Sequence, residues 1–216
     1  MTESPRLVAF LDDVAVVEMS RDDPEVFAEI FNRYGPDIKR YTVRRLGADV
    51  AEDVVSETFL AAFRQRGTYD PARAAVRPWL YGIAANLIRR HVRTELRHLR
   101  AFERTGVDPV MEPFTAASDA RIDAAVAHHR LAAALADLPA RHRDVLLLVA
   151  WGDLTYAEVA QTLGVKIGTV RSRMSRARES IRRTLRAAPG PPQADYEEGE
   201  WESWMSWSEA KKERTS

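Results

Sequence analysis

The sequence predicts an all-α fold of two small helical domains joined by a flexible linker. Apolar residues recur every three or four positions in both halves of the 216-residue chain, which is the period of an amphipathic helix, and no stretch alternates as a β-strand would. Glycine and proline gather between these segments. We therefore expect an N-terminal extension over residues 1–23, a first domain over 24–100, a linker over 101–118, a second domain over 119–186 and an acidic, tryptophan-containing tail over 187–216.

The composition disfavours several classes of protein. The chain has no cysteine, which removes disulfides and thiolate metal sites, and its five histidines show no ligand spacing. We find no phosphate-binding loop, nucleophile triad or metal-binding pattern, so we expect neither an enzyme nor a cofactor or metal. The apolar stretch from Leu7 to Met19 is interrupted by Asp12 and Asp13, which argues against a signal peptide and a membrane span. These features predict a cytoplasmic protein.

The first domain is expected to contain several helices separated by glycine and proline. Asp23 and Pro24 have the form of a helix cap followed by a first-turn proline. The predicted breaks between helices are Gly35-Pro36, Gly47 and the segment 67–78.

One helix of the first domain is predicted to carry an acidic face. Asp49 and Glu52 have the spacing of a capping box at its start. Asp53 and Glu57 lie four residues apart beside Ser56, and like charges at this spacing destabilise an isolated helix by roughly 0.2–0.5 kcal/mol. An acidic stripe that repels itself suits a cationic protein partner, and an ordinary solvated face is the alternative.

A helix predicted to begin near Val76 separates apolar residues from arginines. Its apolar side consists of Leu80, Ile83, Ala84 and Leu87. Its other side consists of Asn86, Arg89, Arg90, Arg93 and Arg97. An amide within a row of arginines is typical of nucleic-acid binding, because arginine binds phosphates while asparagine can donate to and accept from a base edge. A solvated arginine face is the alternative.

The loop before this helix contains aromatic residues. Tyr69 and Trp79 lie among Pro71 and Pro78 and could receive an unstacked base. Stacking of a base on an aromatic ring contributes about 1–3 kcal/mol. The alternative for Trp79 is a place in the hydrophobic core.

The second domain is expected to end in a helix-turn-helix. A first helix stops at Leu138-Pro139 and a second runs from Arg141 to Trp151. Thr155 and Glu158 form a capping box at the start of a short helix, and Gly164 supplies the left-handed residue that ends it. The residues predicted to face inward from the last two helices are Tyr156, Val159, Ala160 and Leu163, then Ile167, Val170, Met174, Ala177 and Ile181.

The second helix of this motif is rich in arginine. The N-terminal part of such a helix enters the major groove of DNA, where arginine pairs with guanine. The candidate base-reading residues are Arg171, Ser172, Ser175 and Arg176, and the candidate flanking contacts are Thr169, Arg173 and Arg178. Later arginines up to Arg186 are expected to contact phosphates or solvent. An amphipathic surface helix without a DNA role is the alternative.

Charge is unevenly distributed along the chain, although its formal net charge is zero. The tail from residue 187 carries seven acidic and three basic residues, which leaves four more basic than acidic residues upstream. Within the tail, a helix would gather Trp201, Trp204, Trp207 and Met205 on one broad face. We hypothesise that this tail folds back on the arginine helices or binds a regulator; a disordered tail is the alternative.

Four segments together resemble the bacterial sigma factors of the sigma-70 family, and more narrowly the extracytoplasmic-function group. The resemblance covers about residues 24–186 and rests on the order of these motifs. They are Ala51-Glu-Asp-Val-Val-Ser-Glu-Thr-Phe59, Arg77-Pro-Trp-Leu-Tyr-Gly-Ile-Ala-Ala-Asn86, Leu138-Pro139 with Arg143-Asp-Val-Leu-Leu-Leu148, and Gly168-Thr-Val-Arg-Ser-Arg173 with Arg176-Ala-Arg178.

The resemblance implies a protein that binds core RNA polymerase, directs it to promoters and assists their melting. By position it implies that Asp53, Ser56 and Glu57 meet the clamp helices of the largest polymerase subunit, and that the second domain meets the flap. It places the contacts to the minus-ten element at Tyr69, Asn86, Arg89, Arg90 and Arg93. It places the contacts to the minus-thirty-five element at Thr169, Arg171, Ser172, Arg173, Ser175, Arg176 and Arg178. An anti-sigma protein is a further candidate partner.

The chain departs from the commoner pattern of this family at three positions. Ser56 stands where glutamine is frequent, and Ala85 and Arg90 stand where arginine and aspartate are frequent. The promoter sequence that this chain recognises is therefore not inferred from the family. A stand-alone helix-turn-helix regulator, which binds an operator without polymerase, is the competing function. The arginine helix and the acidic stripe of the first domain favour the sigma factor, because an operator-binding protein needs neither.

Overall fold

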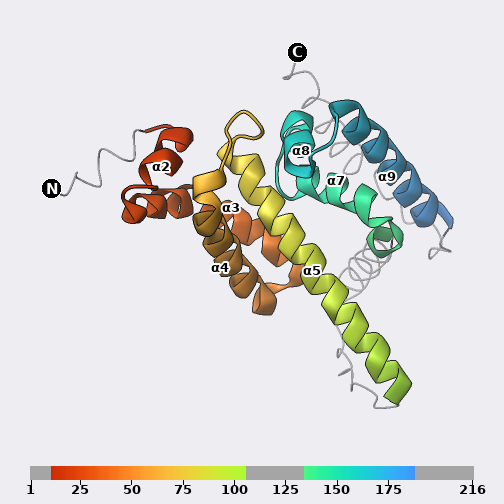
Figure 1. Cartoon of the computed structure of the whole chain (residues 1–216). Helices are drawn as coiled ribbons and strands as arrows, with labels where there is room; N and C mark the ends of the chain where they lie inside the picture. The colour runs from red at the N-terminus through yellow and green to blue at the C-terminus, as the bar shows by residue number, and fades with distance from the viewer. Residues whose placement is uncertain (1–10, 106–133, 188–216) are drawn as a thin grey trace, which may run out of the picture.

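A computed structural model describes residues 11–105 and 134–187 of the chain (Figure 1). These residues form helices joined by loops, without a strand, which confirms the predicted all-α class. The first domain contains α2 (Asp13–Met19), the 3-10 turn η1 (Pro24–Phe27), α3 (Ala28–Leu46), α4 (Ala48–Gln65), the 3-10 turn η2 (Arg66–Thr68) and α5 (Val76–Thr105). The second domain contains α7 (Ala140–Ala150), α8 (Tyr156–Leu163) and α9 (Ile167–Ala187).

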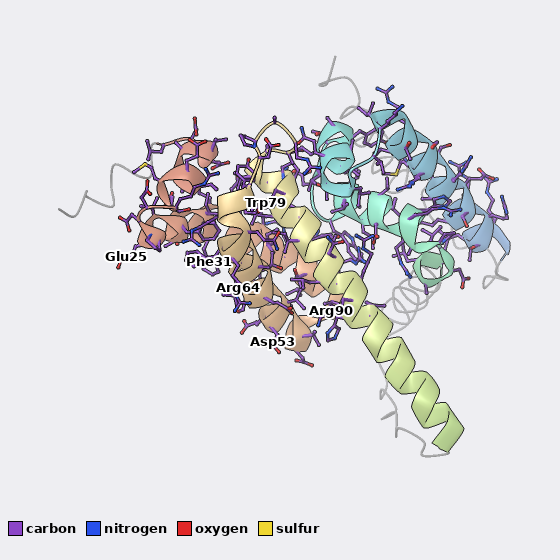
Figure 2. The ribbon with its side chains drawn as sticks, in the orientation of Figure 1. Glu25, Phe31, Asp53, Arg64, Trp79 and Arg90 are labelled. Carbon is purple, nitrogen blue, oxygen red and sulfur yellow. The ribbon has the colours of Figure 1, made fainter. Side chains whose placement is uncertain are left out.

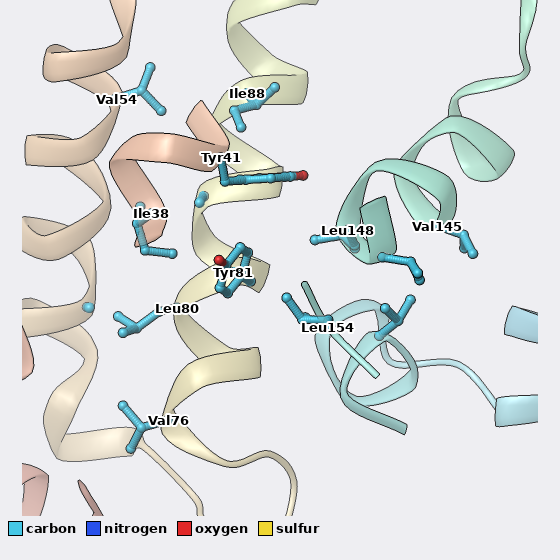
Figure 3. Packing of buried hydrophobic residues seen from close by; sticks show 14 of the residues in the cluster. Ile38, Tyr41, Val54, Val76, Leu80, Tyr81, Ile88, Val145, Leu148 and Leu154 are labelled. Atoms are coloured by element: carbon cyan, nitrogen blue, oxygen red, sulfur yellow. The ribbon is translucent and has the colours of Figure 1, made fainter. Parts of the chain in front are cut away.

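The core of the first domain lies between α3, α4 and the first half of α5. Ile38, Val54, Leu80 and Ile88 lie in it and are at most 4% exposed, whereas the fully buried Tyr41 extends toward the second domain (Figure 3). The second half of α5 continues beyond this core as a single projecting helix (Figure 1).

The described part of the N-terminal extension packs onto the first domain. The Asp12 side chain accepts a hydrogen bond from the Ala15 amide at 2.7 Å and so caps α2. Val16 and Val17 of this helix are fully buried. Asp13 forms an ion pair with Arg33 of α3 at 2.8 Å. The two aspartates that interrupt the apolar stretch therefore begin and anchor a short helix.

The predicted break at Gly35-Pro36 is wrong, because α3 continues through both residues. A proline inside a helix costs about 3 kcal/mol through its missing amide hydrogen and its steric clash. Ile30, Ile38 and Tyr41 lie on either side of it and are fully buried. Burying a large apolar side chain contributes roughly 1.5–3 kcal/mol, so three such residues on one face outweigh the local penalty.

The predicted break at Gly47 is confirmed, but the capping box at Asp49 and Glu52 is not formed. Gly47 has φ +84° and serves as the cap, so that α4 begins at Ala48. Glu52 instead forms an ion pair with Lys39 of α3, with 2.7 Å between the carboxylate oxygen Oε1 and the ammonium nitrogen Nζ. This exposed contact also lowers the pKa of the Glu52 carboxyl, chiefly through the hydrogen bond from Lys39.

The second domain is centred on α7, whose consecutive residues from Val145 to Val149 are all at most 4% exposed. A helix that is buried nearly all round has neighbours on every side. Here α9 and α8 cover parts of its surface, and the remaining side faces the first domain (Figure 1).

The two domains pack directly against each other, chiefly through α5 and α8. Tyr81 of α5 lies opposite Leu148 and Leu154 of the second domain (Figure 3). The fit is close at Gly152, where a Cβ atom would lie 2.7 Å from the Leu148 carbonyl oxygen and 2.9 Å from the Tyr81 ring. The sequence predicts two tethered domains but gives no sign of this shared, buried surface.

Candidate nucleic-acid interface

The helix-turn-helix has the local geometry that the sequence predicts. The Thr155 hydroxyl accepts a hydrogen bond from the Glu158 amide at 3.2 Å, and the Glu158 carboxylate accepts one from the Thr155 amide at 2.8 Å. Gly164 is left-handed, with φ +61°, and ends α8. These contacts set where α8 begins and where it ends.

The buried side of α9 follows the predicted stripe except at its first residue. Val170, Met174, Ala177 and Ile181 are at most 2% exposed. Ile167 is 37% exposed, so its predicted burial is wrong. As the first residue of α9 it stands at the end of the stripe.

The opposite side of α9 is open to solvent and carries all four candidate base-reading residues, namely Arg171, Ser172, Ser175 and Arg176. The three candidate flanking residues, Thr169, Arg173 and Arg178, are half-buried beside them. The Ser172 hydroxyl donates to the Thr169 carbonyl at 3.1 Å, so a base edge would have to compete with this intrahelical bond.

A small cavity of about 280 Å³ lies between α8 and α9. Its lining includes Tyr156, Ser175, Arg171, Arg178 and Arg182, together with Glu179. The Glu179 carboxylate forms an ion pair with Arg182 at 3.2 Å, so that three arginines and one carboxylate give the cavity a net positive charge. Guanidinium groups bind phosphate oxygens in a bidentate manner, which suits such a surface to a phosphate of the DNA backbone.

His142 of α7 lies next to the arginines of α9. Its pKa is lowered from the ordinary value of 6.5, first by burial and then by the positive charges of Arg141, Arg176 and Arg173. The three arginines place positive charge near His142 on this side of the second domain, and positive charge attracts DNA.

The arginine face of α5 is only partly available. Asn86 is exposed and the Arg90 side chain is 79% exposed, whereas that of Arg89 is 41% exposed. Arg89 donates a short hydrogen bond to the Asn86 side-chain oxygen and forms an ion pair with Asp144 of the second domain at 3.7 Å. The side chain of Arg93, like that of Arg97, lies outside the described residues.

The aromatic segment before and at the start of α5 is a formed structure, but the predicted loop is too long, because α5 begins at Val76 and Trp79 lies in its first turn. Tyr69 is only 6% exposed, its hydroxyl donates to the Ala74 carbonyl at 2.9 Å, and its ring lies 4.8 Å from that of Trp79. Burial raises the pKa of the Tyr69 hydroxyl. In this conformation Tyr69 supports the loop from within, and the half-buried Trp79 packs partly against the core.

The acidic stripe on α4 is exposed as predicted, with Asp53, Ser56 and Glu57 on one face. Leu60 continues the same face one turn later and is 47% exposed. Phe31 of α3 is 49% exposed and packs edge-on against Phe59 at 4.9 Å. Figure 2 shows Asp53, Arg64 and Phe31 along the outer side of the first domain.

Leu60 and Phe31 are exposed apolar residues that are not among the predicted contacts. Leu60 could have been found, because it is an apolar residue at helical spacing from Ser56 and Glu57 on an otherwise polar face. Phe31 could not, because only the packing of α3 against α4 brings it to this surface.

In the part of the chain that the structure describes, no helix is both long and apolar enough to cross a bilayer. The same residues contain no cluster of three or more histidine, aspartate or glutamate side chains that could hold a metal ion.

Comparison with known families gives two matches, one to each domain. Residues 30–98 match the model of sigma-70 region 2. Residues 128–181 match the model of sigma-70 region 4. The matches include α5 up to residue 98 and α9 up to residue 181, and thus most of both arginine-bearing helices.

Curated relatives are similar over most of their length. The RNA polymerase sigma factor CarQ of Myxococcus xanthus is 33% identical over 172 residues, which cover 78% of this chain and 95% of CarQ. The extracytoplasmic-function sigma factor RpoE of Cereibacter sphaeroides is 28% identical over 183 residues, which cover 81% of this chain and 95% of RpoE.

Two solved structures share the fold. CnrH in complex with the cytosolic domain of CnrY superimposes with a TM-score of 0.58 at 24% identity, covering 82% of this chain and 99% of CnrH. The sigma factor RpoE of Bartonella quintana, in complex with the anti-sigma factor NepR, gives a TM-score of 0.52 at 22% identity, covering 76% of this chain and 98% of RpoE.

Proposed function

The chain belongs to the sigma-70 family of RNA polymerase sigma factors, in its extracytoplasmic-function group, and we propose which of its residues bind the promoter and which bind core polymerase. The factor binds core RNA polymerase and directs it to specific promoters to initiate transcription. The observation that carries this function is the family match over both domains, since a stand-alone operator-binding protein would need only the second.

The upstream promoter element is read by the exposed side of α9. Arg171, Ser172, Ser175 and Arg176 lie in the first half of this helix, which is the part that enters the major groove in a helix-turn-helix. Thr169, Arg173 and Arg178 flank them and bind the DNA backbone. The three-arginine cavity beside α8 supports a phosphate contact by Arg178.

The minus-ten element is contacted by the arginine face of α5. Asn86 and Arg90 are exposed and point away from the core, which supports direct contact with bases and phosphates. Arg89 and Arg93 extend this face along the helix. Tyr69 acts by supporting the loop beside Trp79, and the loop receives a base once the duplex opens.

Core polymerase binds the outer side of the first domain. Asp53, Ser56 and Glu57 supply a polar, mainly acidic stripe. Leu60 and Phe31 add apolar area next to it, which is the combination expected of a protein interface with a polar rim. The second domain contacts the polymerase flap.

The factor acts as an initiation subunit, and we assign it no catalytic step. Its work on polymerase and DNA takes place in the cytoplasm. An anti-sigma protein is a further partner, a proposal that draws on the complex of the Bartonella quintana factor with NepR.

Run-off transcription with core polymerase and a promoter library tests this function. The full chain should direct initiation from a subset of sequences that share two spaced elements. Tight binding to duplex DNA without any binding to core polymerase would overturn the assignment and favour the operator-binding alternative.

A further inference from the structure

The loop between α4 and α5, residues 66–75, is held at its start by two arginines from different parts of the chain. Arg66 reaches back to the turn that follows α2, where its Nε donates to the Ser20 carbonyl at 2.9 Å. Arg21 reaches in the other direction and donates to the carbonyls of Arg66 and Tyr69, each at 3.4 Å. The turn after α2 and the start of the loop are therefore joined by contacts in both directions.

The Arg66 guanidinium also joins the ends of two helices. Ser20 is the C-cap of α2, and Phe63 lies in the last turn of α4, where its carbonyl accepts from the Arg66 Nη1 at 2.7 Å. Carbonyl groups at helix C-termini carry partial negative charge, so a cation between two such ends stabilises both. The guanidinium stacks on the Phe63 ring, 3.8 Å from its centroid. Two nitrogens of this half-buried side chain are thus used within the protein.

α2 is itself fixed to the first domain and can therefore act as a support. Two of its valines are fully buried. The Asp13 carboxylate pairs with Arg33 of α3 at 2.8 Å, and the Tyr34 hydroxyl donates a short hydrogen bond to the other oxygen of the same carboxylate. The arginine contacts to the turn after α2 therefore connect the loop to a packed element.

The rest of the loop has a defined shape. The Tyr69 hydroxyl donates to the Ala74 carbonyl at 2.9 Å and so closes the loop. Within it, the Asp70 carboxylate accepts from the Ala72 amide at 3.0 Å, and the Asp70 carbonyl accepts from the Arg73 amide at 3.1 Å. The tip is thus a turn on a fixed base, and its side chains are exposed.

Fixing the loop in advance bears on the capture of a base. A flexible loop has to be ordered when it binds, and the lost freedom lowers its affinity. A loop that Arg66 already holds loses less freedom. The alternative role for Arg66 and Arg21 is attraction of DNA phosphates by their charge, which requires no particular geometry.

We propose that Arg66 and Arg21 are positioning residues for the loop that receives a base of the minus-ten element, and that the turn after α2 is the support to which they hold it. This rests on the proposed function, which gives the loop that role. α2 and its following turn lie before the region 2 match over residues 30–98, so the match assigns them no part in promoter recognition. The N-terminal extension thereby acts on recognition of the minus-ten element through protein contacts alone.

Arg66→Lys separates positioning from attraction by charge. Lysine keeps the positive charge, but one ammonium group cannot reproduce the fork that bonds Ser20 and Phe63 together. Arg66→Ala removes both the charge and the fork. Arg21→Ala removes the weaker contacts, whose 3.4 Å distances are long for hydrogen bonds. Arg44→Ala, at an exposed arginine of α3 in the same domain, is the matched control.

The motion of the loop is measured without DNA. The chain has no cysteine, so Ala72→Cys at the exposed tip can carry a nitroxide spin label in the full-length protein. Electron paramagnetic resonance reports motion of the label on the nanosecond timescale of loops. We expect a restricted label in the unsubstituted and Arg44→Ala backgrounds, and a clearly more mobile label in Arg66→Lys and Arg66→Ala.

Binding of the holoenzyme to fork-junction DNA measures recognition. The probe carries the upstream element as duplex and the minus-ten element as a single strand, with a sequence selected in the run-off assay, and is compared with a probe whose minus-ten bases are scrambled. The preference of Arg66→Lys for the matched probe should fall about fivefold or more, as expected for the loss of hydrogen bonds, and that of Arg21→Ala about twofold. Affinities for core polymerase and for an upstream-element duplex should stay within about twofold.

The outcomes separate the positioning role from the function on which it rests. A label equally restricted in the folded Arg66 variants, or an undiminished preference for the matched probe in Arg66→Lys, would overturn the proposal. If only Arg66→Ala loses this preference, Arg66 is a charge contact with DNA. An unsubstituted holoenzyme that does not distinguish the two probes would instead overturn the proposed function. If circular dichroism shows Arg66→Ala to be unfolded, Arg66→Lys and the exposed Arg21→Ala still decide the question.

Discussion

The Arg77 guanidinium reaches across the domain boundary to the Glu158 carboxylate, with 3.0 Å between Nη1 and Oε1. The other Glu158 oxygen completes the capping box with Thr155 at the start of α8. One carboxylate therefore sets both the beginning of the DNA-binding motif and its attachment to the first domain. Substitutions at Glu158 would mix these two roles, so each is better tested through its own partner.

Thr155→Ala should destabilise the second domain while it retains both Glu158 and its partner Arg77. Loss of a capping hydroxyl costs about 1 kcal/mol of unfolding free energy, because the Glu158 amide loses its acceptor. Urea denaturation followed by circular dichroism measures this change. Thr155→Ser retains the hydroxyl and should stay within about 0.5 kcal/mol of the original protein; an equal loss in both variants would show that the cap is not responsible.

Arg176→Ala should weaken binding to the upstream element by about 1–3 kcal/mol if its guanidinium pairs with a base. The side chain is exposed on the reading side of α9, so the substitution should leave folding intact. Fluorescence anisotropy with a selected duplex and a scrambled one measures the specific part of the loss. Arg44→Ala, at an exposed arginine of α3 outside the proposed DNA contacts, serves as the control and should leave binding to both duplexes unchanged. Equal weakening on both duplexes would make Arg176 a phosphate contact.

Leu60→Ala should weaken binding to core polymerase by about 1 kcal/mol or more, as expected for an apolar side chain buried on complex formation. Because Leu60 is 47% exposed, its truncation should change the unfolding free energy of the factor much less. Titration of labelled factor with core polymerase measures the affinity. Leu60→Met keeps the apolar volume and should bind nearly as well; unchanged binding by Leu60→Ala would exclude this residue from the interface.

Protonation of His142 should destabilise the second domain below about pH 6.5. Its pKa is lowered in the folded state by burial and by nearby arginines, so the unfolded chain binds the proton more readily. Stability is therefore fully present above the unfolded pKa of 6.5 and is lost as the pH falls toward the lower folded pKa. Urea midpoints between pH 7.5 and about 5 should show this loss, and His142→Gln should reduce it. An unchanged pH dependence in that variant would contradict the assignment.

Local signals in the sequence are sufficient for the helix-turn-helix but not for the packing of the domains. Thr155 caps the start of α8 and Gly164 ends it, and each of these roles depends only on residues nearby in the sequence. The structure confirms both predicted roles. Pro36 locally disfavours a helix, but α3 continues through it because burial of apolar residues on both sides stabilises the helix. The pairing of Asp144 with Arg45 joins residues 99 positions apart, and no local pattern distinguishes these two from other charged residues. The same holds for Phe31, whose exposure depends on how α3 meets α4.

Truncation after Ala188 tests the hypothesis that the acidic tryptophan tail restrains the factor. The tail lies outside the described residues, so the hypothesis rests on its sequence, with seven acidic residues and three tryptophans next to an arginine-rich helix. If the tail covers the arginine helices, its removal should raise affinity for promoter DNA and for core polymerase. Substituting Trp201, Trp204 and Trp207 with alanine in the full chain keeps the acidic charge and separates aromatic docking from electrostatic attraction. If the full-length and truncated proteins bind promoter DNA with equal affinity and core polymerase with equal affinity, the hypothesis is wrong.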